Sequence, residues 1–138
     1  MPLVVGLDER FGWTPALSLP LKVSSLVIII AGFAISSYAL VENRFFSGVA
    51  RIQTDRGHHV VSSGPYARVR HPGYAGGLLT YVATSLFLDS LWAYLPVVVL
   101  MVLLVIRTGL EDRTLQAELA GYRDYASRVR FRLLPGVW

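Results

Sequence analysis

Long apolar runs alternate with charged segments along this chain. The first run, Val23–Val41, contains no charged residue. A helix needs about 20 apolar residues to cross the hydrocarbon core of a bilayer, so we expect a transmembrane helix over residues 21–41. The run is too long, and lies too far from the N-terminus, to be the apolar core of a signal peptide.

A second apolar stretch, Pro72–Ile106, contains a single charge at Asp89. It is too long for one span, and the Asp89 region divides it into residues 73–88 and 91–106. At about 1.5 Å per residue each half reaches roughly 24 Å, somewhat less than a core of about 30 Å. We predict a tight helical hairpin with Asp89 at the far membrane interface. A hairpin buried in a soluble domain is disfavoured, because residues 97–106 are apolar on every side.

The remaining charges indicate an orientation. The connector at residues 42–70 contains five Arg, and the tail from Arg107 contains six. Both lie on the same side of a three-span topology, and basic loops stay in the cytoplasm. We therefore expect a multi-pass protein of a bacterial inner (plasma) membrane, with its N-terminus outside and its C-terminus inside. Any active site formed by the connector and the tail would then face the cytosol. This rule and anionic lipid headgroups account for the pI of about 9.8. Nucleic acid is not an expected partner, because no basic helix or aromatic ladder of a known reader is present.

Composition narrows the class of protein further. The 138 residues are 54% hydrophobic and 16% charged, which excludes a disordered chain. The absence of Cys excludes a disulfide framework, a thiolate metal site and a cysteine nucleophile. We expect one domain over residues 1–138, an all-α polytopic membrane protein with about three transmembrane helices. Apolar residues recur every three to five positions in residues 108–130, which predicts a cytosolic C-terminal amphipathic helix.

The end of the connector has unusual chemistry for a membrane boundary. Arg70 and His71 come directly before Pro72, which suits the first turn of a helix. Gly76 and Gly77 then allow a ligand or another helix to approach the backbone closely. The start of the helix offers N–H groups to an anion. An interfacial Arg-His pair beside an aromatic belt explains the same residues equally well.

A second candidate pair lies at the end of the hairpin. Arg107 and Glu111 are four residues apart, so they share one helix face. Arg before Glu is the less favourable order for a stabilising surface pair, which weakens a purely structural interpretation. A charge next to an apolar span is either an interface anchor or a ligand contact, and Arg107 by itself is more often an anchor.

Taken together, these segments resemble a known family. The motifs are R-H-P-x-Y-x-G at residues 70–76, then the hairpin, R-T-x-x-E-[ED]-x-x-L at residues 107–115 and Y-x-x-Y-x-x-x-V at residues 122–129. The pattern resembles the isoprenylcysteine carboxyl methyltransferase family and the wider group that includes phospholipid N-methyltransferases. The resemblance covers about residues 53–135. It implies an integral membrane enzyme that uses S-adenosylmethionine (AdoMet), bound between the connector (42–72) and the tail (107–138).

The resemblance also assigns roles, position by position. Arg107 matches the substrate-binding position, and Arg107 and Glu111 are the expected catalytic residues. Among the cofactor positions Gln53 is the loosest match, and Asp112 stands where a second Glu is usual. The expected cofactor contacts are Gln53, His58, His59, Val60, Val61, Tyr66, His71, Pro72, Gly73, Tyr74, Glu111 and Asp112.

The chemistry of these residues is compatible with those roles. Carboxylates suit the sulfonium and amine of AdoMet, N–H groups near residues 72–74 and His71 suit its carboxylate, and Tyr66 or Tyr74 can stack on adenine. A carboxylate acceptor needs no base, and Arg107 could bind it at two points. An amine acceptor needs a base such as His71 or Glu111. The Arg favours O-methylation of a lipid-like or hydrophobic carboxylate, and a phospholipid amine is the alternative.

The sequence gives weaker support to several other functions. We expect no metal site, because His58 and His59 would point apart in an extended strand. Ser62 and Ser63 lack the base of a nucleophilic site. Sterol reductases resemble this C-terminal architecture but use NADPH, and a non-enzymatic membrane protein that binds anionic lipid or a partner is a third reading. Relatives usually have more spans before this region, so we expect a minimal form, a truncated product or a homo-oligomer whose copies complete one pocket.

Overall fold

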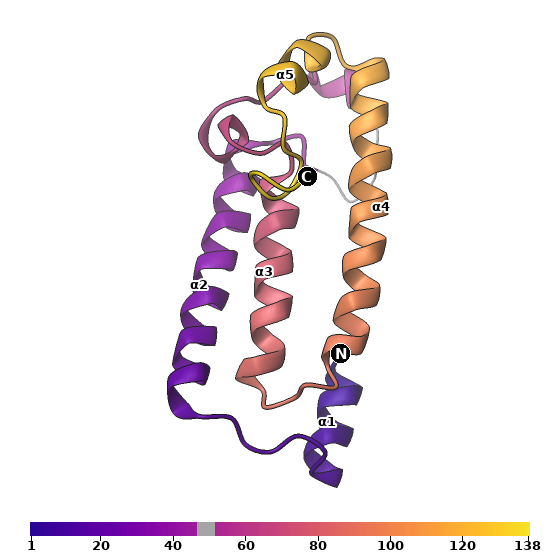
Figure 1. Ribbon diagram of the computed structural model, residues 1–138. Coiled ribbons are helices and arrows are strands. Elements are labelled where there is room, and N and C mark those ends of the chain that lie inside the picture. The colour runs from indigo at the N-terminus through magenta and orange to yellow at the C-terminus, as the bar shows by residue number, and fades with distance from the viewer. Residues whose placement is uncertain (47–51) are drawn as a thin grey trace.

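The computed structural model describes residues 1–46 and 52–138, and it is helical throughout its regular elements. In chain order these are α1 (Pro2–Phe11), α2 (Leu19–Glu42), the short 3-10 turns η1 (Thr54–Arg56) and η2 (Gly64–Ala67), α3 (Pro72–Phe87), α4 (Tyr94–Glu118) and α5 (Tyr122–Arg128). Figure 1 shows α2, α3 and α4 running side by side, with α1 at one end and α5 at the other. The all-α prediction is confirmed. The described residues include no strand, so His58 and His59 lie in a loop rather than in the strand expected for them.

Among the residues that the structure describes, two helices are long and apolar enough to cross a membrane, α2 and α4. Their 24 and 25 residues reach about 36 and 38 Å, more than the roughly 30 Å of a hydrocarbon core. Most of their large apolar side chains are exposed, including Val27 and Phe33 of α2 and Leu95 and Leu103 of α4. Such helices suit a lipid environment, and they support association with a membrane. The α3 helix has 16 residues, and its expected role as a third span stays a prediction.

Small residues bring α2 and α3 into close contact. Ser25, Gly32 and Ala39 are the buried residues of α2, and they recur at intervals of seven. A Cβ atom on Gly32 would lie 2.5 Å from Thr80 Oγ1, and one on Gly76 would lie 2.5 Å from the Gly32 carbonyl oxygen. The two backbones can approach this closely only because neither position carries a side chain.

The turn between α3 and α4 lies where the sequence predicted it. Asp89 follows the end of α3 and has φ 53°, a left-handed conformation that Asp tolerates better than most residues. Its carboxylate accepts a hydrogen bond of 2.9 Å from the Leu17 N–H and pairs with Lys22. The whole length of α3 separates this turn from His71 at its other end (Figure 1).

The C-terminal segment differs from the prediction. A single amphipathic helix over residues 108–130 is wrong, because α4 continues without a break to Glu118 and a separate α5 follows. No proline lies between Ile106 and Glu118, so α4 continues past the apolar run into the tail. The helix ends at Leu119, whose backbone is extended, and Gly121 then precedes α5 with φ 80°, a left-handed conformation that glycine adopts readily. Likewise α4 begins at Tyr94 rather than at Leu91.

Candidate active site

A cavity opens at the end of the bundle where the connector, α4 and α5 meet. The space between its walls, counted out to the open mouth and including solvent there, is about 740 Å³. Many predicted cofactor residues line it: His58, His59, Val60, Val61, Tyr66, His71, Gly73, Tyr74 and Glu111. The further lining residues are Asn43, Phe45, Phe46, Ile52, Arg70, Thr114, Leu115, Leu119, Tyr122 and Tyr125.

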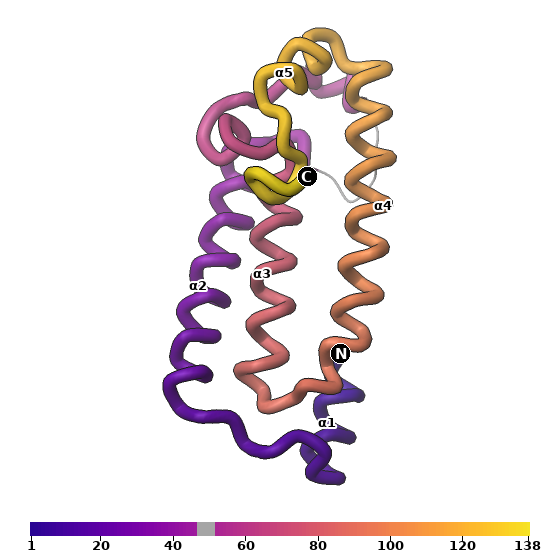
Figure 2. Tube along the Cα trace, in the orientation of Figure 1, coloured from indigo at the N-terminus to yellow at the C-terminus, as the bar shows by residue number. Residues whose placement is uncertain are grey.

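Backbone hydrogen bonds join the two distant segments at this cavity. The Arg70 N–H donates to the Phe131 carbonyl oxygen at 3.0 Å, and the His71 N–H donates to that of Arg132 at 2.8 Å. Figure 2 shows the C-terminal segment beside the start of α3. Pro72 begins α3 here but does not itself line the cavity.

Tyr74 connects the two charged residues of the α4 motif. Its hydroxyl donates to Glu111 Oε2 at 2.8 Å and accepts from Arg107 Nε at 3.1 Å. Arg107 Nε also lies 4.0 Å from Glu111 Oε2. The shared helix face predicted for Arg107 and Glu111 is therefore confirmed. Glu111 lines the cavity, whereas Arg107 lies outside the lining.

His71 is buried between two carboxylates. Its ring stacks on Tyr74 with centroids 5.8 Å apart and planes parallel. Nδ1 lies 3.9 Å from Glu111 Oε1, and Nε2 lies 3.7 Å from Asp112 Oδ1. Within the described residues, Nε2 makes no hydrogen bond. The imidazole thus has donor or acceptor capacity beside the cavity wall.

Asp112 occupies a different place from the one expected of a cofactor contact. It is fully buried and does not line the cavity. Arg70 Nη2 donates to its Oδ2 at 3.0 Å, and Arg70 Nε lies 2.8 Å from its Oδ1. Gln116 and Arg132 also donate to Oδ2, at 2.8 and 3.0 Å, and Tyr122 donates to Oδ1 at 3.0 Å. Both oxygens of Asp112 therefore accept hydrogen bonds from the protein itself, rather than facing the space where a cofactor would bind.

Arg70 also connects the hydrogen-bond network around Asp112 to α5. Its Nη1 donates to the carbonyl oxygens of Ala126, Val129 and Arg130 at 3.2, 2.9 and 3.3 Å. The last carbonyls of a helix have no partner within the helix, and a cation near them is favourable. One guanidinium therefore caps α5 and binds the buried Asp112.

Two tyrosines of α5 complete the cavity wall and were absent from the expected contacts. Burial, and then the Asp112 carboxylate, raise the pKa of Tyr122. Burial also raises the pKa of Tyr125, whose hydroxyl donates to the Tyr66 carbonyl oxygen at 2.7 Å. Both hydroxyls thus stay protonated as donors. The Y-x-x-Y spacing of the tail motif was the signal that could have identified them.

The η1 loop supports the opposite wall. Gln53 is buried and does not line the cavity. Its Nε2 donates to the Phe45 carbonyl oxygen at 2.6 Å, and its Oε1 accepts from Arg56 at 2.8 Å. The rings of His58 and His59 both lie against Phe45, with centroids 4.5 and 4.9 Å from it. Burial and the neighbouring His59 lower the pKa of His58.

Comparison with known proteins identifies the family. A family model described as phospholipid methyltransferase matches residues 21–120. The chain belongs to the phospholipid methyltransferase family. The resemblance inferred from the motifs is therefore confirmed at family level. The residues matched by the phospholipid methyltransferase family include Tyr74, Arg107 and Glu111 and end before α5.

Individual relatives cover parts of the chain. It is 35% identical over 95 residues to the Delta(14)-sterol reductase TM7SF2 of Mus musculus. This match covers 67% of this chain and 23% of the reductase. It is 39% identical over 64 residues to a probable protein-S-isoprenylcysteine O-methyltransferase of Oryza sativa subsp. indica, and equally to one of subsp. japonica. That match covers 46% of this chain and 34% of each rice protein. The chain thus spans about a quarter to a third of the length of these relatives.

Proposed function

We propose that this protein transfers a methyl group from AdoMet to a lipid-like or hydrophobic acceptor, at the cytosolic face of the membrane. The observation that carries this proposal is the position of Glu111. Its carboxylate lies in the wall of a cavity otherwise lined largely by aromatic and apolar side chains, and Tyr74 holds it. Membership of a methyltransferase family supports the reaction class.

The residues of the cavity fit the chemical groups of AdoMet. Glu111 suits the cationic sulfonium and amine. The first N–H groups of α3, at Gly73 and Tyr74, suit the carboxylate. Val60 and Leu115 offer an apolar surface to adenine.

AdoMet, when bound, supplies an electrophilic methyl group that an acceptor oxygen or nitrogen displaces from sulfur. The protein's own contribution is to orient the groups and exclude water. Tyr74 fixes the carboxylate of Glu111 by a short hydrogen bond. Leu119, Tyr122 and Tyr125 form a buried cluster that closes the α5 side of the cavity. Removal of water from this side strengthens the attraction between Glu111 and a cation.

The residues at the cavity favour a carboxylate acceptor. Arg107 lies one hydrogen bond from Tyr74, and a guanidinium beside the site attracts an anionic group. Such an acceptor is already ionised at neutral pH and needs no base. An amine acceptor, as in phospholipid N-methylation, is the alternative. It would have to lose a proton to His71 or Glu111, whose closest atoms are 3.9 Å apart.

A reductase that uses a phosphorylated nicotinamide cofactor is the second candidate. The match to the mouse sterol reductase, which covers 67% of this chain, favours it. The charges of the cavity argue against it. Arg70 is the Arg among the lining residues, and it already binds Asp112 and the end of α5. Glu111 would repel phosphate groups, whereas it would attract a sulfonium.

Equilibrium titration of the detergent-purified protein tests the proposal. We expect saturable binding of AdoMet, strongly weakened by Glu111→Gln and unchanged by Glu118→Gln, which alters an exposed carboxylate on the same helix. Binding of NADPH without AdoMet would instead support the reductase. Binding of neither would support a non-enzymatic membrane protein. Incubation of membrane extracts with methyl-deuterated AdoMet, followed by mass spectrometry, would identify the acceptor and the atom that is methylated.

A further inference from the structure

A buried carboxylate ties α1 to the α3–α4 turn at the end of the molecule opposite the cavity. Asp8 is 1% exposed. It accepts hydrogen bonds from the N–H and hydroxyl of Thr14, at 2.7 and 2.8 Å, and from Ser90 Oγ at 2.6 Å. The Leu91 N–H in turn donates to Thr14 Oγ1 at 3.1 Å. Because a buried charge is costly without such partners, this set of bonds specifies one position for α1.

This attachment brings three aromatic rings together on the surface. Phe11, Trp13 and Trp92 remain 59%, 50% and 48% exposed. Trp13 stacks on Phe11 with centroids 5.5 Å apart, and Trp92 meets Trp13 edge-on at 5.8 Å. We call these three residues the aromatic cluster. They come from the end of α1, the segment after it and the α3–α4 turn, so only the folded chain assembles them.

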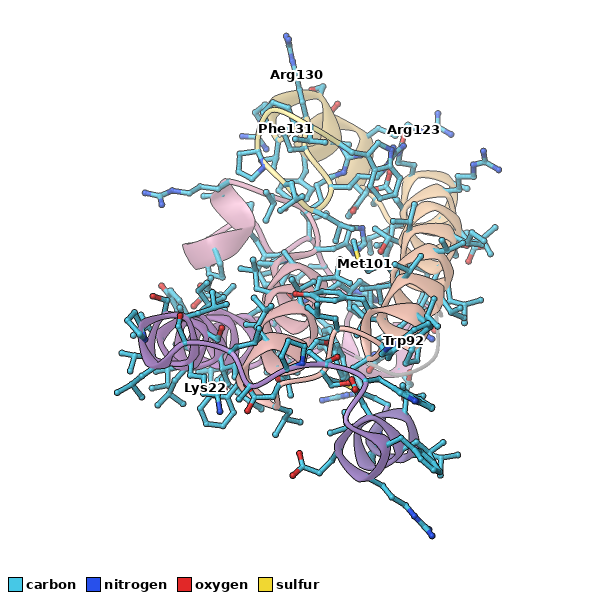
Figure 3. All side chains as sticks on the ribbon, turned by 60° about the horizontal axis from the view of Figure 1, so that its bottom comes forward. Lys22, Trp92, Met101, Arg123, Arg130 and Phe131 are labelled. Atoms are coloured by element: carbon cyan, nitrogen blue, oxygen red, sulfur yellow. The ribbon has the colours of Figure 1, made fainter. Side chains whose placement is uncertain are left out.

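The aromatic cluster lies where the candidate membrane helices begin. Figure 1 shows α1 at the end of the molecule from which α2 and α4 start. Figure 3 looks towards this end and shows Trp92 and Lys22 there, with Arg123 and Arg130 projecting at the far edge. The aromatic cluster thus extends the exposed apolar surface of α2 and α4 to the end of the molecule, where that surface stops. Tryptophan is enriched at such boundaries, because its ring is apolar and its N–H is polar.

Nearby cations and the size of the cluster favour lipid over protein as its partner. The Arg10 guanidinium lies 5.7 Å from the centre of the Phe11 ring, and such a cation attracts lipid phosphate. A fully buried aromatic residue contributes roughly 150–250 Å², so three half-exposed rings offer roughly 300 Å². A stable protein interface needs about 800 Å² from each partner.

We propose that the aromatic cluster is a membrane anchor that inserts into the headgroup region of the leaflet opposite the cavity, and that Asp8 holds it in place. The α1 helix is then a fixed part of the membrane-contacting surface. This role is independent of the reaction at the other end of the molecule.

Tryptophan fluorescence in vesicles tests the proposal, because the chain contains three Trp. Three variants each keep one Trp, at position 13, 92 or 138, and replace the other two by Phe. They are reconstituted into phosphatidylcholine vesicles whose acyl chains carry bromine either near the headgroup or near the chain end. We expect bromine near the headgroup to quench Trp13 and Trp92 most strongly. Trp138 stacks under Arg132 in the tail and is the control, with little quenching by either lipid.

A second pair of variants tests the attachment of α1. Asp8→Asn removes the buried charge, and we expect it to reduce lipid quenching of Trp13 while Trp92 keeps its depth. Glu9→Gln changes the exposed neighbour on the same helix and should alter neither. If Asp8→Asn prevents folding, Thr14→Val removes one hydroxyl donor and should cause a smaller change of the same kind.

Two results would overturn the proposal. One is quenching of Trp13 and Trp92 by aqueous iodide in vesicles, without quenching by brominated lipid, because the cluster would then face water. The other is protection of both Trp only at high protein-to-lipid ratio, because a second copy of the chain would then cover them.

Discussion

Arg70 and Asp112 form a buried ion pair across 42 positions of sequence, with Arg70 Nε 2.8 Å from Asp112 Oδ1. The same guanidinium binds three carbonyl oxygens at the end of α5. Tyr122 and Tyr125 of that helix line the cavity. The pair therefore joins the start of α3, α4 and the α5 wall of the candidate site.

Loss of either partner should destabilise the protein strongly. Asp112→Asn leaves Arg70 with an uncompensated buried charge, and breaking a buried pair in this way costs about 3–5 kcal/mol. Arg70→Lys keeps the charge but loses the planar fork that reaches both Asp112 and α5. Unfolding in detergent measures the change in free energy. Arg68→Lys, at an exposed position, is the control, and equal stability of all four proteins would contradict this role.

The Tyr74 hydroxyl should contribute to cofactor affinity through Glu111. Tyr74→Phe removes the bonds to Glu111 and Arg107 but keeps the ring that stacks on His71. A hydrogen bond contributes about 0.5–1.5 kcal/mol, so we expect AdoMet binding to weaken by about two- to tenfold. Titration calorimetry measures it. Tyr81→Phe alters an exposed tyrosine of the same helix, and an equal loss in both variants would refute the effect of Tyr74.

Arg107 should affect the acceptor more than the cofactor. It lies outside the cavity lining, where its Nε donates to the Tyr74 hydroxyl. Arg107→Ala should leave AdoMet affinity close to normal and reduce turnover, once an acceptor is identified. Binding and steady-state rates, measured on the same preparation, separate the two effects. Arg113→Ala, exposed on α4, should change neither; loss of AdoMet binding by Arg107→Ala would assign Arg107 to the cofactor instead.

Gly76 and Gly77 should respond oppositely to alanine. A Cβ atom at Gly76 would meet the Gly32 carbonyl oxygen at 2.5 Å, whereas one at Gly77 would meet nothing within 4 Å. Overpacking of this kind costs about 1–3 kcal/mol. An open helix position instead gains up to about 1 kcal/mol from alanine. Thermal unfolding of the two variants gives the comparison, and similar melting temperatures would show that α2 and α3 can separate at Gly76.

Acid should release α1. Burial opposes ionisation of Asp8, but hydrogen bonds from Ser90 and Thr14 outweigh it and lower its pKa. Hydrogen bonding to Lys22, and then to the Leu17 N–H, lowers the pKa of Asp89 on the adjoining turn. A carboxyl group with a lower pKa in the folded state stabilises that state above its unfolded pKa, and the effect is lost as pH falls through the folded value.

We therefore expect α1 to stay docked at neutral pH and to detach as pH falls below the ordinary aspartate value of 3.8. Fluorescence of the variant that keeps only Trp13 reports the change. The same titration with Asp8→Asn should show a smaller transition, since only Asp89 then contributes. A transition of equal size at Trp138 would indicate global unfolding instead.

The local sequence pattern was sufficient to predict the features that depend only on residues close together in the chain. An uncharged run of about 20 residues indicates α2, and Asp89 interrupts the hairpin that it was predicted to divide. The shared face of Arg107 and Glu111 follows from helical periodicity alone. The recurrence of short motifs in order was enough to indicate the family, although it left the third span, the acceptor and the role of each site residue as predictions.

Burial and choice of partner depended on the tertiary structure. Asp112 resembles Glu111 in sequence, yet one faces inward to Arg70 and the other lines the cavity, because successive helix residues point about 100° apart. The docking of α1 depends on Ser90, which lies 82 positions from Asp8. The break before α5 depends on Gly121 and on tyrosines that pack against the connector. Periodicity describes one helix at a time, whereas these features depend on which segments meet, and only the packed chain determines that.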